Sequence, residues 1–341
     1  MANTDYASLN VTVRLREQNL LTATDYDNLM NSNDFNELIS QLNQTSYDVP
    51  ENLEETQDYD EFLMDYLKQA YDMIYQFIPD QRVVDLFGLR YSYHNAKILF
   101  KEEYSNRDFS SMYIDLGPYH IDSILHAVQT GESPVLDDHL LRAIQLVRDY
   151  VKDTEQINDV SIMLDDAYLS HMGHLAEEIG DHNLQEWVVL FINLENLSLL
   201  LRGIQQERSS AFLRVALNES GSIPVDNLVA WAENRDFQAI TDAYEGHDLG
   251  EEFRKHLLGS QDQIISGENS GQLTFLEDVI NTLLSEKMRE AQLHAFGPMP
   301  VLSYLYFLEA EVTNLRLIFV GKGSQVNEDK IKERMRPIYD K

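Results

Sequence analysis

The sequence has no cysteine and is short of glycine, proline and positive charge. Without Cys there is no disulfide framework, no thiolate nucleophile and no Cys-ligated zinc or iron–sulfur cluster. Gly is 15 and Pro is 8 of 341 residues, below their usual shares of about 7% and about 5%. Turn-rich β architectures use more of both residues, so the low counts favour long helices joined by few tight turns.

The shortage of positive charge excludes two classes of partner. Against 58 Asp and Glu there are only 26 Lys and Arg, which gives a formal net charge of −32. Proteins that bind nucleic acid neutralise phosphates with cations, and anionic lipid headgroups repel an acidic surface. We therefore expect no nucleic-acid partner and no direct lipid anchoring. The chain is also 43% apolar, with 18 Tyr and 14 Phe, and so has ample material for a packed core.

The sequence shows neither a signal peptide nor a transmembrane helix. Residues 1–6 lack a basic region and an apolar region. The most apolar stretch, 187–201, contains Asn193, Glu195 and Asn196, and so falls short of the roughly 18 apolar residues that a span needs. We expect a soluble, cytoplasmic protein that reaches a membrane only through a protein partner.

Apolar residues recur with helical periodicity. In 62–78, 136–151 and 275–293 they follow the i, i+3/i+4, i+7 spacing of one buried helix face, and Pro79 should end the first segment. Sustained alternation of apolar and polar residues, the pattern of strands, is not evident. The sequence predicts an all-α fold.

A short motif occurs three times. In each copy an asparagine precedes an apolar helical run that closes on a cation, with spacings of 101 and 118 residues between the asparagines. The copies are 95–101, 196–202 and 314–322, beginning at Asn95, Asn196 and Asn314. An Asn on an apolar helix is costly unless its amide is paired, so we expect a shared packing role, such as bonding a neighbouring helix end. A catalytic role would call for one site rather than three.

A second element precedes each copy at a distance of 68, 74 or 88 residues. It begins at Asp27, Asp122 and Asp226, each followed two residues later by Leu or Ile. The joint order of the two elements predicts three helical units, 1–108, 109–208 and 209–341.

One set of side chains could hold a metal ion. His171, His174, Glu178 and His182 fall on one helical face, and two His with a carboxylate can bind zinc. There is no H-E-x-x-H, however, and Gly180 should end the helix before His182. We interpret the set as a solvated polar face, and leave a metal-dependent hydrolase using the first three residues as an alternative.

No other motif supports catalysis or a cofactor. The run 320–324 resembles a phosphate-binding loop, but Gly323 instead of Ser or Thr follows Lys322, and no upstream Gly is present. Helix C-cap chemistry explains Gly321 better. There is no G-x-S-x-G and no G-x-G-x-x-G. We predict no catalytic, cofactor-binding or metal residues.

Charge is unevenly distributed along the chain. Residues 17–67 contain 13 Asp or Glu and no Lys or Arg, whereas residues 314–341 hold seven of the 26 basic residues. Either this reflects a solvated surface and an end helix with ordinary ion pairs, or the two ends dock to different partners.

An ordered set of short motifs along the whole chain resembles one family. The motifs are Arg14-Leu15-Arg16 with Leu20-Leu21, Asp25-Tyr26-Asp27-Asn28-Leu29, Leu42 with Thr45-Ser46-Tyr47, Asn196-Leu197 with Leu201-Arg202-Gly203, and Glu311 with Asn314-Leu315-Arg316 and Gly321-Lys322. They are similar to those of the C subunit of the archaeal and bacterial A/V-type rotary ATPases, whose counterpart in the vacuolar enzyme is called the d subunit. The first copy departs from the family pattern, with Ser92 and Ala96 in place of the usual Glu and Leu.

The resemblance implies an all-helical, funnel-shaped protein with three similar units around a pseudo-threefold axis. It implies a rotor component without an active site, standing between the D and F subunits of the central shaft and the membrane ring of ion-binding subunits. Such a component links ATP hydrolysis or synthesis to transport of H⁺ or Na⁺. On this view Asn95, Asn196, Asn314, Arg202, Glu311 and Arg316 are structural motif residues, and the residues that contact partners are not identified.

A different kind of protein has the same helical character. A cytosolic helical-repeat scaffold that binds soluble protein partners would also show repeated amphipathic helices and no catalytic motif.

Overall fold

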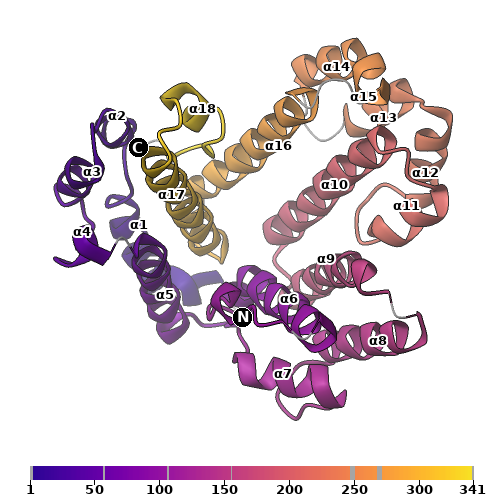
Figure 1. Cartoon of the computed structure of the whole chain (residues 1–341), viewed down its shortest axis with the longest axis horizontal. Coiled ribbons are helices and arrows are strands. Elements are labelled where there is room, and N and C mark those ends of the chain that lie inside the picture. Colours follow the sequence, from indigo (N-terminus) through magenta and orange to yellow (C-terminus); the bar gives the residue numbers. More distant parts are fainter. Residues whose placement is uncertain are drawn as a thin grey trace. The chain divides into compact units, whose positions relative to one another are not determined.

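The computed structural model describes residues 3–56, 58–105, 107–154, 156–245, 250–266 and 271–339. Within these ranges the chain consists of helices, turns and irregular segments, with no strand (Figure 1). The predicted all-α class is therefore confirmed for the described part of the protein. The sequence also predicts a loop at 266–271, where Gly267 and Gly271 occur, and this loop falls largely on residues outside the described ranges.

The chain forms two compact units, and the first of them is discontinuous in sequence. It comprises residues 1–84 and 281–341, and the second comprises residues 85–280. The boundaries fall inside α6 (Arg82–Ser105) and α16 (Gly271–Glu290). The other helices of the first unit are α1 (Ala7–Glu17), α2 (Ala23–Met30), α3 (Phe35–Leu42), α4 (Leu53–Thr56), α5 (Tyr59–Phe77), α17 (Met299–Gly323) and α18 (Glu328–Lys332), with 3-10 turns at Asn3–Tyr6 and Ala291–Leu293.

The second unit is built around a succession of neighbouring helices in which α8 packs against α9 and α9 against α10. Its helices are α7 (Ile121–Thr130), α8 (Asp138–Thr154), α9 (Val160–Ile179), α10 (His182–Gln205), α11 (Ser210–Ala216), α12 (Val225–Asn234), α13 (Phe237–Tyr244), α14 (Gly250–Gly259) and α15 (Gln261–Ser266), with 3-10 turns at Ser110–Met112 and Ile157–Asp159. This division follows packing, whereas the predicted units 1–108, 109–208 and 209–341 follow similarity of sequence.

Helix α17 is the core element of the first unit. It packs against α5 and α1, and buried side chains occur on every side of it, from Leu302 and Leu305 to Leu315 and Ile318. A helix that is apolar all round must lie inside a protein. Helix α5 instead buries one stripe, Leu63, Leu67, Ala70, Tyr71 and Ile74, as its periodicity predicts.

Helix α10 is long and apolar enough to cross a membrane by length and composition alone. However, 67% of its most apolar 18-residue window is buried inside the protein. The core helix of a soluble domain has these same properties, so the helix by itself carries no indication of a span.

The helices end where the sequence places helix-breaking residues. The three periodic segments lie in α5, α8 and α16, and α5 stops at Phe77 because Pro79 holds Ile78 in the extended region (ψ 135°). Gly180 terminates α9 in the left-handed region (φ 73°), as predicted, and Asp181 then caps α10 by accepting a bond from the Leu184 N–H (3.0 Å).

The expected role of Gly321 as a helix C-cap is wrong. Helix α17 continues to Gly323, and Gly321 is needed because Ile331 of α18 packs directly on it. A Cβ at Gly321 would come within 2.3 Å of Ile331 Cδ1. Gly203 of α10 is in the same situation, since a Cβ there would lie 2.6 Å from Leu213 Cδ2 of α11. Both glycines follow their motif asparagine by seven residues.

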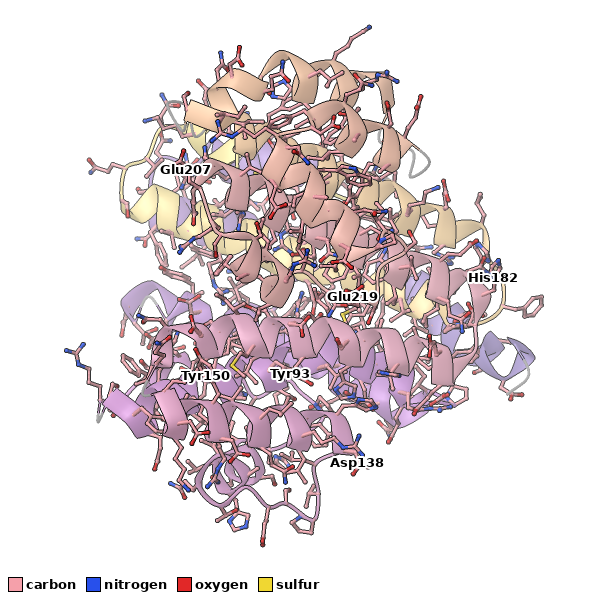
Figure 2. The ribbon with its side chains drawn as sticks, turned by 90° about the vertical axis from the view of Figure 1, so that its right-hand side faces the viewer. Tyr93, Asp138, Tyr150, His182, Glu207 and Glu219 are labelled. Carbon is pink, nitrogen blue, oxygen red and sulfur yellow. The ribbon has the colours of Figure 1, made fainter. Side chains whose placement is uncertain are left out.

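Helices α10 and α17 also end with the same backbone geometry. Each is followed by a non-glycine residue in the left-handed region, Glu207 (φ 52°, labelled in Figure 2) and Gln325 (φ 54°). The next N–H then reaches back to the glycine carbonyl, Arg208 to Gly203 (2.9 Å) and Val326 to Gly321 (2.8 Å). This is the Schellman type of helix end, which usually has glycine at the left-handed position.

Replacing the left-handed residue by glycine should stabilise the protein. For Gln325→Gly we expect the free energy of unfolding to rise by about 0.5–1 kcal/mol, because glycine removes the clash between Cβ and the carbonyl. The greater backbone freedom of glycine in the unfolded chain offsets part of this gain. The urea midpoint of unfolding measures it. Gln325→Ala keeps a Cβ and is the matched control, and an equal gain in that variant would contradict the explanation.

Candidate functional site

The three motif asparagines make the same pair of hydrogen bonds. Each side chain accepts a bond from the main-chain N–H of one downstream residue and donates to the carbonyl of that residue. Asn95 holds Ile114 (2.9 and 2.8 Å), Asn196 holds Asn218 (2.8 and 2.8 Å), and Asn314 holds Arg336 (2.7 and 3.0 Å). The downstream residue is 19, 22 and 22 positions along the chain. We call these paired bonds the asparagine latches.

The latched residues are in irregular segments rather than at helix ends, which the sequence did not indicate. Ile114 follows a 3-10 turn, Asn218 follows α11, and Arg336 follows α18. An amide is well suited to this contact because it offers a donor and an acceptor side by side, matching the two groups of one peptide-bonded residue. A single side chain thereby satisfies two main-chain groups that the segment cannot pair within itself.

In two copies, the residue three positions before the asparagine accepts a bond from a main-chain N–H just ahead of a helix. Glu311, which is 4% exposed, accepts bonds from the Leu21 N–H (2.5 Å) and the Tyr47 hydroxyl (2.7 Å). At the matching position Asn193 accepts a bond from the Ser222 N–H (2.9 Å). Leu21 and Ser222 both come shortly before a helix, α2 and α12 respectively.

The first copy departs here, as the sequence indicated. Its residue three positions before the asparagine is Ser92, whose buried hydroxyl has no hydrogen-bond partner within the described part of the chain. Gly117 passes so close that an added Cβ would lie 2.3 Å from Ser92 Oγ. Seven residues after its asparagine, where the other two copies have the close-packed glycine, the first copy has Glu102. The Glu102 carboxylate accepts a bond from the Phe109 N–H (2.6 Å). A short turn therefore replaces the helix that follows in the other copies.

The two motif arginines are surface residues. Arg202 forms an ion pair with Glu277, and Arg316 with Asp60, in pairs whose side chains are between 40% and 61% exposed. Ion pairs this exposed contribute little to stability. Lys322, near the supposed phosphate loop, binds Glu328 Oε1 at 2.8 Å and so ties α17 to α18.

The histidine face of α9 is divided between the interior and the surface. The side chains of His174 and His182 are 58% and 80% exposed, which fits the predicted solvated face. For His171 that prediction is wrong, because α8 covers it and leaves the residue 5% exposed. Its Nδ1 lies 3.3 Å from the hydroxyl of Tyr93, which Figure 2 labels, and its ring stacks on that of His139 with centroids 4.9 Å apart.

Burial lowers the pKa of His171 to about 4, although Asp137 Oδ2 lies 3.6 Å from Nε2 and acts in the opposite direction. The neighbouring rings of His139 and His174 add to the lowering. A neutral imidazole in a packed layer is a structural group. Among the described residues, no three His, Asp or Glu side chains are arranged to hold a metal ion.

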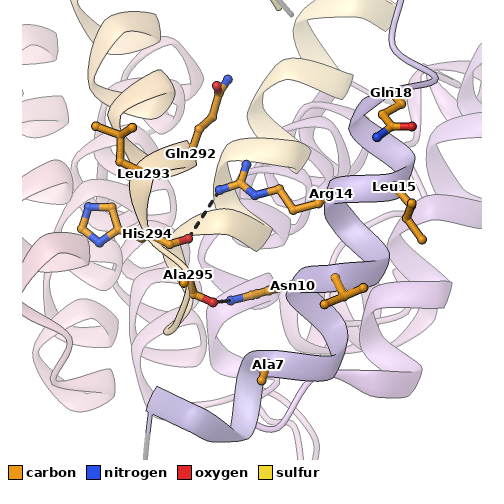
Figure 3. Close-up of a pocket in the computed structure, with 10 residues that line it drawn as sticks. Ala7, Asn10, Arg14, Leu15, Gln18, Gln292, Leu293, His294 and Ala295 are labelled. Carbon is orange, nitrogen blue, oxygen red and sulfur yellow. Dashed lines mark hydrogen bonds between the residues drawn. The ribbon is translucent and has the colours of Figure 1, made fainter.

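One groove in the first unit has features of a binding surface. It runs between α1 and the segment 291–297 and encloses about 440 Å³ (Figure 3). Its lining is contributed by Ala7, Asn10, Val11, Arg14, Leu15, Gln18, Gln292, Leu293, His294 and Ala295. Several of its apolar side chains are exposed, with Leu15 at 60% and Leu293 at 87%.

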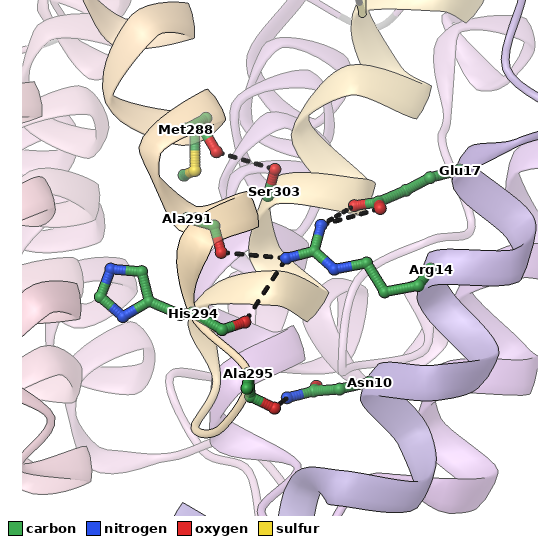
Figure 4. Close-up of polar contacts among 8 residues, drawn as sticks. All are labelled: Asn10, Arg14, Glu17, Met288, Ala291, His294, Ala295 and Ser303. Carbon is green, nitrogen blue, oxygen red and sulfur yellow. Dashed lines mark hydrogen bonds and ion pairs between the residues drawn. The ribbon is translucent and has the colours of Figure 1, made fainter. Parts of the chain in front are cut away.

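Polar contacts fix the two walls of the groove (Figure 4). The Asn10 Nδ2 donates to the carbonyls of Ala295 (3.3 Å) and Gly297 (3.2 Å). The Arg14 guanidinium donates to the Ala291 carbonyl (3.1 Å) and binds both oxygens of Glu17 at 2.8 Å. No sequence-based prediction includes this site, although the i, i+4 spacing of Val11 and Leu15 on an exposed helix face could have indicated it.

Removing a latch should destabilise the protein strongly. For Asn196→Ala we expect a loss of about 2–4 kcal/mol, because two hydrogen bonds vanish and the buried N–H and carbonyl of Asn218 lose their partners. The change in the urea midpoint measures it. Asn234→Ala, which removes one exposed bond to the Ala230 carbonyl, is the control and should cost less than about 0.5 kcal/mol. Equal losses of stability in the two variants would contradict the role assigned to the latch.

The pKa of His171 predicts how stability varies with pH. The unfolded state takes up the proton near pH 6.5 and the folded state only near pH 4, so stability falls as the pH drops through this window. The difference between the two pKa values corresponds to about 3 kcal/mol in the free energy of unfolding. In His171→Gln this part of the pH dependence should disappear, whereas His174→Gln should keep it. Denaturation series at several pH values distinguish the two results.

Known proteins similar to this chain span its whole length. The sequence model of the ATP synthase (C/AC39) subunit matches residues 9–334. The C subunit of the V-type sodium ATPase of Enterococcus hirae is 29% identical over 343 residues, which cover 98% of this chain and 99% of that protein. The C subunit of the A-type ATP synthase of Methanocaldococcus jannaschii is 21% identical over 349 residues, covering 96% of this chain and 85% of that protein.

The family match takes in most of both compact units, the three motif asparagines and α1 through α18 almost entirely. The resemblance noted in the sequence is thereby confirmed at the level of the family, and a scaffold unrelated to ATPases is no longer needed to explain the repeats. The chain belongs to the ATP synthase (C/AC39) subunit family, as the C subunit of a V/A-type ATPase.

Proposed function

We propose that this chain is the non-catalytic rotor component that joins the D and F subunits of the shaft to the membrane ring of ion-binding subunits. The observation that carries the proposal is the family match over residues 9–334. In this role the protein lies on the cytoplasmic side, peripheral to the membrane, and turns with the shaft and the ring. It links ATP hydrolysis or synthesis to ion transport without a reaction of its own.

We further propose that the chain consists of three similar units, 1–108, 109–208 and 209–341, arranged around a pseudo-threefold axis. The three latches support this, because the same side chain makes the same two bonds at 19 to 22 residues downstream. The second and third copies also share the close-packed glycine and the left-handed residue after the helix. Chance similarity between helices does not reproduce so many features at fixed offsets.

A coupling role requires that load applied at one end reach the other without being absorbed by sliding helices. Apolar contacts between helices resist separation but are weakly directional, whereas hydrogen bonds fix position and angle. Each latch fixes a long helix to a segment that the helix itself does not contain. The proposed role therefore agrees with where the chain places its buried polar bonds.

The ion that is transported belongs to the ring rather than to this chain. The relative from Enterococcus hirae is named as part of a sodium ATPase. We accordingly propose that the complex in which this chain works transports H⁺ or Na⁺. Whether that complex spends ATP on transport or makes ATP from it is a property of the whole complex.

Deleting the gene in its host tests the function. We expect membranes from the deletion strain to hydrolyse ATP without ion uptake, and we expect re-expression of the wild-type chain to restore uptake. ATP hydrolysis and ion uptake into inverted vesicles are measured on the same preparation. Purified protein should also bind the isolated D–F complex.

The result that overturns the proposal is ion uptake at the wild-type ratio to ATP in the deletion strain. Asn234→Ala, which changes one exposed hydrogen bond, serves as the re-expressed control and should restore uptake fully. Restoration of uptake by this variant shows that the expression system delivers a working chain to the deletion strain.

A further inference from the structure

The groove between α1 and the segment 291–297 lies in two stretches of sequence that lack acidic residues. Asp and Glu make up 58 of 341 residues, about one in six, yet none occurs in 6–16 or in 291–308. None of the ten lining residues is acidic, and the one lining cation, Arg14, is neutralised by Glu17. This groove is therefore a nearly uncharged surface on a strongly acidic protein.

The rim of the groove is apolar and exposed. Val11 and Leu15, one turn apart on α1, are 63% and 60% exposed, and Leu293 and Phe296 across the groove are 87% and 54% exposed. Exposed apolar side chains that gather beside a groove mark an interaction site more often than scattered ones do. Their arrangement on two walls fits a partner that inserts between α1 and the segment 291–297.

The unpaired polar atoms of the wall are buried and do not face the groove. Asn10 is 4% exposed, and since its Nδ2 donates to two carbonyls, the remaining atom Oδ1 is an acceptor. Neither this oxygen nor Gln292 Nε2 has a hydrogen-bond partner among the residues that the structure describes. Because both atoms are buried, they offer no hydrogen bond to a molecule in the groove, and the exposed part of the groove is mainly apolar.

The geometry points to this groove as the surface that docks an uncharged helix end of one of the ring proteins. The inference rests on the proposed function. The ends of the ring helices lie at the membrane surface, where anionic headgroups repel carboxylates. A chain with a net charge of −32 can approach that plane only through its least acidic face, and the groove is such a face. Docking also covers the exposed apolar rim.

Photo-cross-linking in the complete ATPase complex tests the assignment. The photoreactive residue p-benzoylphenylalanine replaces Leu15 or Leu293 in the groove, or Leu146 of α8 as a control of similar exposure (65%). After irradiation of the purified complex, we expect adducts with the ring protein from Leu15 and Leu293 but not from Leu146. Adducts from the groove positions to D, to F, to lipid or to a second copy of this chain would overturn the inference, as would no adduct.

A binding measurement separates this inference from the proposed function. Leu15→Asp puts a carboxylate on the groove, and we expect it to weaken binding to the detergent-purified ring at least tenfold while binding to D–F stays unchanged. Leu146→Asp should leave both affinities unchanged. If the wild-type chain binds neither D–F nor the ring, the proposed function fails. If it binds both, and Leu15→Asp binds the ring as tightly as the wild type does, only the groove assignment fails.

Discussion

The structure depends on one repeated interaction, the pairing of an asparagine amide with both main-chain groups of a residue about 20 positions away. Irregular segments are the weak point of a helical protein, because their N–H and carbonyl groups need partners when they are buried. Asn95, Asn196 and Asn314 supply those partners from inside long helices. The segments held by Asn95 and Asn196 lead into α7 and α12, so each of these two helices starts from a fixed point.

The close-packed glycines work together with the latches. With Leu213 packed on Gly203 and Ile331 on Gly321, the short helices α11 and α18 come nearer to their long helices than any side chain at the glycine positions would permit. A hydrogen bond on one side and a close apolar contact on the other hold each short helix from two directions. Stiffness of this kind suits the coupling role proposed for this chain, and the groove proposed to dock the ring differs chemically from the rest of an acidic molecule.

Local pattern predicted the helices and pointed to the asparagines, since both leave a signal within a few residues. The spacing in 62–78 was enough for α5, and the repetition of Asn before an apolar run singled out the latches. The roles of other residues depend on distant chain. The purpose of Gly321 is clear only when Ile331 is seen to pack against it. His139 of α8 contacts both His171 and His174, yet the packing of the helices buries the first and leaves the second exposed. The groove brings Asn10 to Ala295, 285 residues away, and no local rule predicts that contact.

The discontinuity of the first compact unit imposes an order on folding during synthesis. Residues 1–84 emerge from the ribosome first, but their apolar stripe on α5 has no cover until α17, which begins at Met299, has been synthesised. Residues 85–280 can meanwhile fold as a unit, because their contacts lie within that stretch. The nascent chain thus carries an uncovered helix face through most of translation, and chaperones have that long interval in which to recognise it.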